Sequence, residues 1–331
     1  MNRHPLRHPP APTTAALFLL MGVLGGCAYL VRSATLVYLN VNAMFSSKEI
    51  EIVINKSFIE KYKDRVSITT TFTVDKARQN PIAPMFDGDF HMAGRAPEIT
   101  LPAVAEIANG DSAKKAIGLV HGAEGTRKPL KISGVWRIWP EHGGGEKQEQ
   151  GEPLLAMESD NPSHVFEIHP VTRINDVEVL HTFTPIEGFM GGDAHNCFEI
   201  YEKAECALTV RPKAVSIVTH KGLRNDVEFI MEITEDRQIE VPGGRFVIAS
   251  ARDLKGNLLV ERLRMVFATG TPPERAVRLL KRGDRLHVFG LPRMDFAAVS
   301  RRAMSSQTNP ALLVKPLPYE IIIQGVYKDA K

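Results

Sequence analysis

Residues 130–137 read LKISGVWR, and they decide the fold because residues 286–293 read LHVFGLPR. Both segments begin with leucine, carry a glycine at the fifth place and end with arginine. Glycine inside a strand is typical of sharply coiled barrel strands, where a side chain would meet the neighbouring backbone. The match indicates that the chain contains two copies of the same series of β-strands.

Each of these segments is the fourth strand in a series of five, recognised by alternating or β-branched residues. In the first half we predict strands at 66–74, 89–94, 102–107, 131–139 and 165–171, with a helix at 113–120. In the second half we predict strands at 227–233, 245–250, 258–266, 283–290 and 319–327. A helix at 272–280 opens on two prolines, which favour a helix start.

Three strands, a helix and two strands follow one another in both halves, and this order resembles the OB fold. The resemblance covers most of residues 60–330 and rests on element order without a diagnostic motif. We therefore expect a mainly β chain with short helices, in which an N-terminal membrane anchor precedes two OB-like five-stranded barrels. A generic β-sandwich and one larger β domain are the alternatives.

The expected boundaries follow from these patterns. They are 1–26 for a signal or anchor segment, 27–59 for a tether or continued anchor, 60–175 for the first barrel, 176–215 for a connector and 216–331 for the second barrel.

The N-terminus carries an apolar run that ends in Leu24-Gly25-Gly26-Cys27, with arginines before it and no acidic residue before Glu49. This arrangement resembles a bacterial lipoprotein signal peptide with its lipobox. The resemblance implies that Cys27 is acylated, which places the chain on the periplasmic or extracytoplasmic face of a membrane. An uncleaved single-pass helix at about 13–31 is the first alternative, because roughly 20 uncharged residues span a bilayer. A purely structural apolar segment is the second.

The charge balance limits the partners. The formal net charge is +3, and Arg3 and Arg7 supply two of these charges, so the remainder of the chain is close to neutral. A nucleic-acid-binding surface needs a basic stripe that neutralises phosphates. We therefore expect no nucleic-acid partner, and we expect the membrane, through the anchor, and an envelope protein as partners.

Acids and histidines gather in two loops of the first half, and OB barrels bind ligands at these loops, between strands 1 and 2 and between strands 4 and 5. The first loop ends in Asp87, Asp89 and His91, the second begins with Glu141 and His142, and the fifth strand carries Glu167 and His169. Carboxylate and imidazole groups bind Zn²⁺, Mn²⁺ or Ca²⁺. These seven residues form a candidate site for a divalent metal, the one cofactor that the sequence suggests.

Structural roles compete with the metal interpretation. The sequence Asp87-Gly88-Asp89 forms turns readily. Pro170 is typical of an edge strand, which would leave Glu167 in solvent. The sequence contains no His-x-x-His, His-Glu-x-x-His or Cys-x-x-Cys spacing, so no strong zinc signature supports the metal.

Cys197 and Cys206 could form one disulfide. The segment between them is typical of a helix, and nine helical residues span about 13 Å, whereas a disulfide joins Cα atoms within about 7 Å. The bond therefore forms only if this segment turns.

No catalytic motif is present, neither a Gly-x-Ser-x-Gly elbow nor a Walker loop. The sequence favours a membrane-anchored cell-envelope protein with a non-catalytic role in binding a ligand or partner. The alternative is a metal-dependent hydrolase with its site between the two loops, in which the metal activates water and a carboxylate acts as base.

Overall fold

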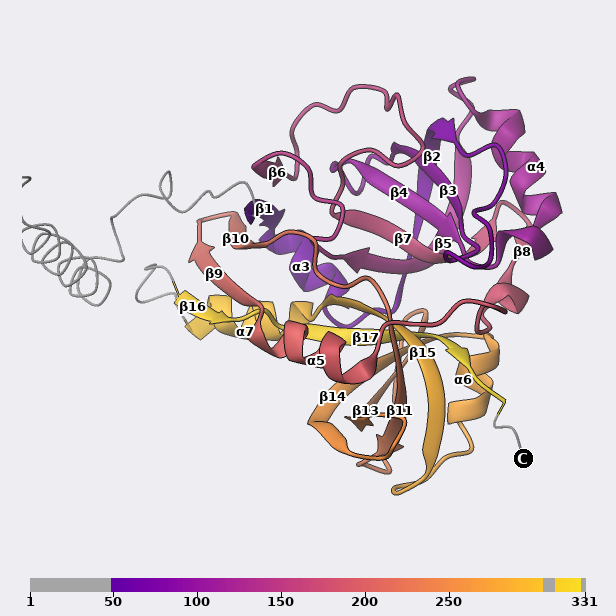
Figure 1. Cartoon of the computed structure of the whole chain (residues 1–331). Helices are drawn as coiled ribbons and strands as arrows, with labels where there is room; N and C mark the ends of the chain where they lie inside the picture. The colour runs from indigo at the N-terminus through magenta and orange to yellow at the C-terminus, as the bar shows by residue number, and fades with distance from the viewer. Residues whose placement is uncertain (1–48, 306–312, 329–331) are drawn as a thin grey trace, which may run out of the picture. The chain divides into compact units, whose positions relative to one another are not determined.

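The computed structural model describes residues 49–305 and 313–328. The lipobox, Cys27 and the apolar run at 13–31 lie outside these residues, so the anchor stays a prediction. Within the described ranges, no helix is long and apolar enough to cross a bilayer. Figure 1 shows a mainly β arrangement with a few short helices.

The first barrel has the strand order predicted for an OB fold. It contains β2 (Ser67–Ala77), β3 (Phe90–Arg95), β4 (Ala103–Ile107), β5 (Leu130–Ile138) and β7 (Phe166–Ile174). The sheet runs β4-β3-β2-β5-β7 and closes through a parallel pairing of β4 with β7. Helix α4 (Lys114–Ala123) lies between the third and fourth strands in sequence, and β8 (Val177–Glu178) pairs antiparallel with β7.

The second barrel repeats this topology. Its strands are β11 (Val227–Ile233), β13 (Gly244–Arg252), β14 (Leu258–Ala268), β15 (Arg285–Met294) and β17 (Tyr319–Val326). The order is β11-β15-β17-β14-β13, and β11 pairs with β13 to close it. The third strand again pairs in parallel with the fifth. Helix α6 (Pro272–Val277) follows β14, and β12 (Ile239–Val241) pairs antiparallel with β13. Two closed five-stranded barrels are thus confirmed.

A third sheet was not predicted. Its strands are β16 (Leu313–Pro316), β9 (Glu205–Val210), β10 (Ala214–His220), β1 (Glu49–Asn55) and β6 (Lys147–Glu149), in that spatial order. The end of the expected tether therefore forms β1 and the start of helix α3 (Lys56–Tyr62), and the expected connector contains helix α5 (Ala194–Lys203) and β9. Strand β10 crosses the expected boundary at 215, so most of it lies in the part of the chain expected to form the second barrel. Helix α7 (Phe296–Ser305) lies against α3 and β9. These strands come from distant parts of the chain, and local patterns do not reveal which strands pair.

The fourth-strand glycines have the predicted role. A Cβ on Gly134 would lie 2.5 Å from Ile168 Cγ2, and a Cβ on Gly290 would lie 2.4 Å from Ile321 Cγ2. The strand register shifts beside both glycines. Each glycine therefore lets its strand approach the fifth strand closely, and Ile168 and Ile321 are equivalent positions.

A buried arginine–glutamate pair is also repeated, three residues beyond each glycine. Arg137 on β5 pairs with Glu167 on β7, and Arg293 on β15 pairs with Glu320 on β17. Arg137 Nε donates to the carbonyl of Pro292 at 2.8 Å, next to Arg293. Arg293 Nη1 donates to the carbonyl of Trp136 at 2.9 Å, next to Arg137. The two pairs thus join the barrels through reciprocal contacts.

Candidate functional site

The predicted acids and histidines lie on the outer side of the first barrel wall. In β3, β4 and β7, alternate residues such as Phe90 and Ile168 belong to the hydrophobic core. The residues between them, among them His91, Glu106 and Glu167, point to the opposite face because side chains alternate along a strand. All three are 5 % exposed or less, so this polar face is covered.

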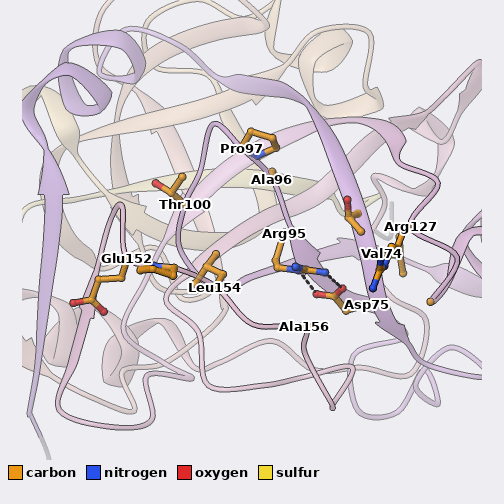
Figure 2. Close-up of a pocket in the computed structure, with 13 residues that line it drawn as sticks. Val74, Asp75, Arg95, Ala96, Pro97, Thr100, Arg127, Glu152, Leu154 and Ala156 are labelled. Atoms are coloured by element: carbon orange, nitrogen blue, oxygen red, sulfur yellow. Dashed lines mark hydrogen bonds and ion pairs between the residues drawn. The ribbon is translucent and has the colours of Figure 1, made fainter.

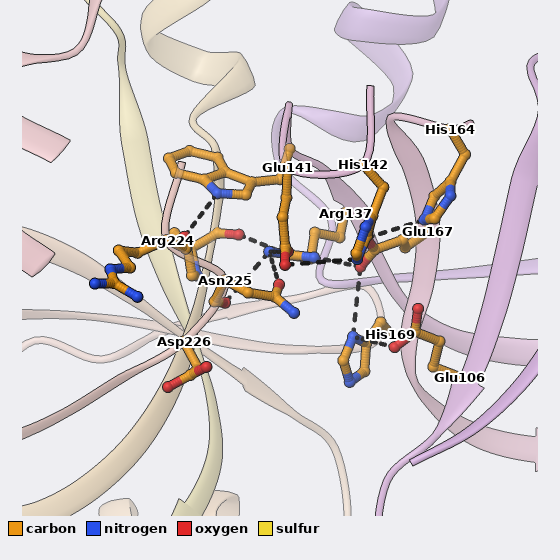
Figure 3. A network of polar contacts seen from close by, with 12 residues as sticks. Glu106, Arg137, Glu141, His142, His164, Glu167, His169, Arg224, Asn225 and Asp226 are labelled. Carbon is orange, nitrogen blue, oxygen red and sulfur yellow. Dashed lines mark hydrogen bonds and ion pairs between the residues drawn. The ribbon is translucent and has the colours of Figure 1, made fainter. Parts of the chain in front are cut away.

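His169 contacts three carboxylates of the polar cluster, and Figure 3 shows two of them, Glu106 and Glu167. Its Nε2 lies 3.0 Å from Asp89 Oδ2, and its Nδ1 lies 3.1 Å from Glu106 Oε2. Nδ1 also lies 3.4 Å from Glu167 Oε2. His91 Nε2 lies 3.5 Å from Glu106 Oε2, at the edge of the cluster. Imidazole and carboxylate groups of the first barrel therefore meet in a buried space.

Glu167 connects this cluster to the loop between strands 4 and 5. It forms an ion pair with Arg137, and it lies 3.3 Å from His164 Nε2. His164 Nδ1 contacts the carbonyl of Pro162 at 2.7 Å. Arg137 also donates to Asn225, just before the second barrel. Glu167 thus forms ion pairs with Arg137, His164 and His169, which are all groups that can carry positive charge.

Burial and neighbouring charges shift the pKa values in this network. Burial disfavours the charged forms of Glu167 and His169, but their partners outweigh it. Arg137 and the two histidines hold the pKa of Glu167 well below its ordinary value. Glu106, Asp89 and Glu167 raise the pKa of His169 well above its ordinary value. Burial raises the pKa of Asp89 to about 6, against the opposing effect of His169.

The structure brings Asp89, Glu167 and His169 of the predicted site together, with His91 beside them. Asp87 has the turn role instead: its Oδ1 accepts from the Asp89 amide at 3.1 Å, and the glycine between them has a φ of +71°. Glu167 does not lie on an edge strand, because β7 pairs with both β5 and β4.

Three residues of the cluster were not predicted. Glu106 is the charged residue in the strand sequence AVAEI, and β4 places it opposite His91. Pairing of the predicted second and third strands could have indicated this contact. His164 and Arg137 gave no comparable signal, because their roles depend on how the 4–5 loop and the second barrel fold over the first.

Glu141 and His142 line a separate cavity of about 620 Å³. The His142 and His164 rings stack at 5.1 Å, and Glu141 lies 3.8 Å from Arg137, so the cavity adjoins the cluster (Figure 3). Burial raises the pKa of Glu141 to about 8, although Arg137 lowers it. The other lining residues come from the segments before the second barrel: Phe189, Met190, Gly192, Gly222, Leu223, Arg224, Asn225 and Asp226.

A larger cavity of about 840 Å³ lies beside β2 and β3 of the first barrel (Figure 2). The bidentate pair of Arg95 and Asp75 lies within it, with N–O distances of 2.8 and 2.7 Å. Asp75 also accepts from the amide of Met157. Because these charges already satisfy each other, this cavity gives weaker evidence of a ligand than the one at Glu141.

Both candidate disulfide cysteines are free and buried. Cys197 lies in α5 and contacts the carbonyl of Asp226, whereas Cys206 lies in β9 and contacts the carbonyl of Pro316. The predicted helix is present as far as Lys203. The two thiols are not joined.

No protein-family model and no curated protein matches the chain. Among solved structures, it is similar to a deletion mutant of the single-stranded DNA-binding protein from Thermus aquaticus. The sequence identity is 11 %, the TM-score is 0.22, and the match covers 80 % of this chain and 94 % of that chain.

This match contradicts our expectation that nucleic acid is not a partner, because the matched protein binds single-stranded DNA. The expectation rested on the net charge, which averages over the whole surface and does not describe a single loop or groove. A likeness at a TM-score of 0.22 does not identify a partner either.

Proposed function

We propose that this chain is a membrane-anchored extracytoplasmic protein that binds a small ligand, without catalysis, in the cavity at Glu141. Cys27 of the lipobox supplies the anchor in this proposal. The observation that carries the binding role is the cavity itself, about 620 Å³ beside the 4–5 loop of the first barrel. This volume is in the range of small-molecule sites, and this loop is where OB barrels bind ligands.

The charges of the cavity favour a ligand with an amine or guanidinium group. Within the described ranges, Glu141 Oε2 is buried without a hydrogen-bond partner, and its ion-pair partner Arg137 is shared with Glu167. Asp226 accepts from the amide of Gly192 at 2.6 Å, and burial raises its pKa. A cationic group would favour the ionised forms of Glu141 and Asp226, and Phe189 and Met190 offer apolar surface to the rest of the ligand.

The test is isothermal titration of the full chain in detergent with arginine, lysine and spermidine, and with glutamate as the acidic control. We expect binding of a cationic compound and a loss of at least tenfold in affinity in Glu141→Gln and in Asp226→Asn. Glu158→Gln, an exposed acid outside both cavities described above, is the matched control. Equal binding of glutamate, or unchanged affinity in both cavity variants, would contradict the proposal.

A further inference from the structure

We propose that the first barrel holds one divalent transition-metal ion in a closed site formed by Asp89, Glu106 and His169. This site is separate from the cavity at Glu141 and does not depend on the ligand proposed for it. Each of the three residues offers one donor atom, and these atoms lie within 4.8 Å of one another. All three side chains are 5 % exposed or less.

Two buried polar atoms at this place have no hydrogen bond. Within residues 49–305 and 313–328, Asp89 Oδ1 and His169 Nε2 are buried and lack a hydrogen-bond partner. His169 Nε2 lies 3.0 Å from Asp89 Oδ2, yet this contact does not have hydrogen-bond geometry. Burying a polar atom without a hydrogen bond is energetically costly. Two such atoms on neighbouring side chains, Asp89 and His169, therefore indicate that a partner is missing between them.

The hydrogen-bonding capacity of the histidines also requires a cation. A neutral imidazole has one N–H donor and one lone pair. His169 faces carboxylates with both ring nitrogens, and His164 faces a carbonyl with one and Glu167 with the other. In each ring, one lone pair would therefore point at an oxygen lone pair unless a proton or a metal ion intervenes.

The charge count matches one divalent ion. Asp89, Glu106 and Glu167 carry three negative charges when ionised, and Arg137 is the permanent cation of the network. With neutral histidines, a net charge of about −2 would remain in a buried space, which is costly without compensation. One divalent ion neutralises that charge, and His169, which binds the ion, then needs no added proton.

The second barrel shows that the fold does not require this cluster. Its register places Phe246 where the first barrel has His91, Val266 in place of Glu106, and Ile322 in place of His169. These three residues form an apolar cluster on the corresponding face. The equivalent wall of the second barrel, which has the same topology, is therefore formed with hydrocarbon side chains. The polar residues of the first barrel thus have a purpose other than forming the fold.

The donor set and the burial indicate the kind of metal and its role. One imidazole and two carboxylates suit Zn²⁺ or Mn²⁺ better than Ca²⁺, which takes six to eight oxygen ligands. Metal-binding histidines usually contact a carboxylate through the other ring nitrogen, as His169 does with Glu167 at 3.4 Å. Three protein ligands leave a coordination position for water, but all three side chains are 5 % exposed or less, so we assign a structural or storage role rather than hydrolysis.

The test uses the full chain without an affinity tag, stripped with EDTA in detergent and titrated with Zn²⁺, Mn²⁺ and Ca²⁺. We expect one tightly bound Zn²⁺ or Mn²⁺ per chain by elemental analysis, a rise in melting temperature, and weak or no binding of Ca²⁺. X-ray absorption of the loaded protein should show nitrogen and oxygen ligands without sulfur.

The variants His169→Gln and Asp89→Asn should weaken binding at least a hundredfold. The matched control is His287→Gln, because His287 also contacts a glutamate, at 2.8 Å, but lies in the second barrel. Circular dichroism of the stripped variants shows whether they fold. Absence of bound metal in the folded wild-type chain, or equal affinity in folded His169→Gln and His287→Gln, would overturn the site. Amine binding at Glu141 can succeed or fail independently.

Discussion

The two barrels have the same strand order, the same fourth-strand glycine and the same arginine–glutamate pair, but they differ on the outer face of strands 2, 3 and 5. The second barrel covers this face with Phe246, Val266 and Ile322, and the first barrel covers it with ionisable residues. Shared features indicate what the fold and the contact between barrels require. The features that differ are free to serve binding, so the comparison separates structure from function within one chain.

The largest expected effect on stability comes from breaking the arginine–glutamate pair that both barrels share. Arg137→Met and Arg293→Met should each lower the free energy of unfolding by about 3–5 kcal/mol, because each removes the fully buried arginine of an ion pair. Glu167 keeps its contacts with His164 and His169, and Glu320 keeps its ion pair with Arg264. Urea unfolding of the full chain, followed by circular dichroism, measures this loss. Arg285→Met, whose pair with Glu232 is half exposed, should change stability by less than about 1 kcal/mol. A large loss in only one barrel would show that the two pairs are not equivalent.

The sequence predicted the barrels well because their information is local. Alternating patterns, a proline-started helix and the glycines at 134 and 290 each mark one element, and element order then fixes the topology. The third sheet was missed because β6 has three residues inside a predicted loop and β1 lies in the predicted tether. Strand partners distant in sequence leave no local signal.

The site was predicted less completely for the same reason. Asp89, Glu167 and His169 were found because they lie at the starts of strands whose preceding loops meet in an OB barrel. Glu106 could be inferred only from the register that sets it opposite His91. Arg137 was missed because its partners include Pro292 and Asn225, which belong to the other half of the chain.

The next largest effect comes from replacing the polar outer face of the first barrel by the apolar residues of the second. We expect the first barrel to accept the residues of the second in a variant that combines His91→Phe, Glu106→Val and His169→Ile with Asp89→Ala, which removes the remaining carboxylate of the site. Replacing a buried ionic network by apolar residues is often neutral or stabilising by about 1–4 kcal/mol. The metal-free unfolding free energy should therefore stay equal or rise, while metal binding is lost.

The reciprocal variant, Phe246→His, Val266→Glu and Ile322→His, is the control for this exchange. It places ionisable groups in an apolar face without the other members of the network, so it should destabilise the second barrel strongly. Urea unfolding in EDTA compares both variants with the wild type. If the first exchange prevents folding, the polar cluster belongs to the fold and the functional interpretation of the difference fails.

The smallest expected effect is the pH dependence of the two faces. The folded-state pKa of His169 is raised, so its contribution to stability is fully present below about pH 6.5 and is lost as the pH rises through the folded value. In EDTA, the unfolding free energy should fall above pH 6.5 by at most about 1.4 kcal/mol per pH unit for each such group. The exchanged variant should have a flatter profile, because Phe, Val and Ile do not titrate.

Saturating Zn²⁺ should remove or reverse the slope in the wild type, because metal and protons compete for the same nitrogens. An identical slope in the wild type and the exchanged variant would assign the pH dependence to groups outside this face and remove one difference between the barrels.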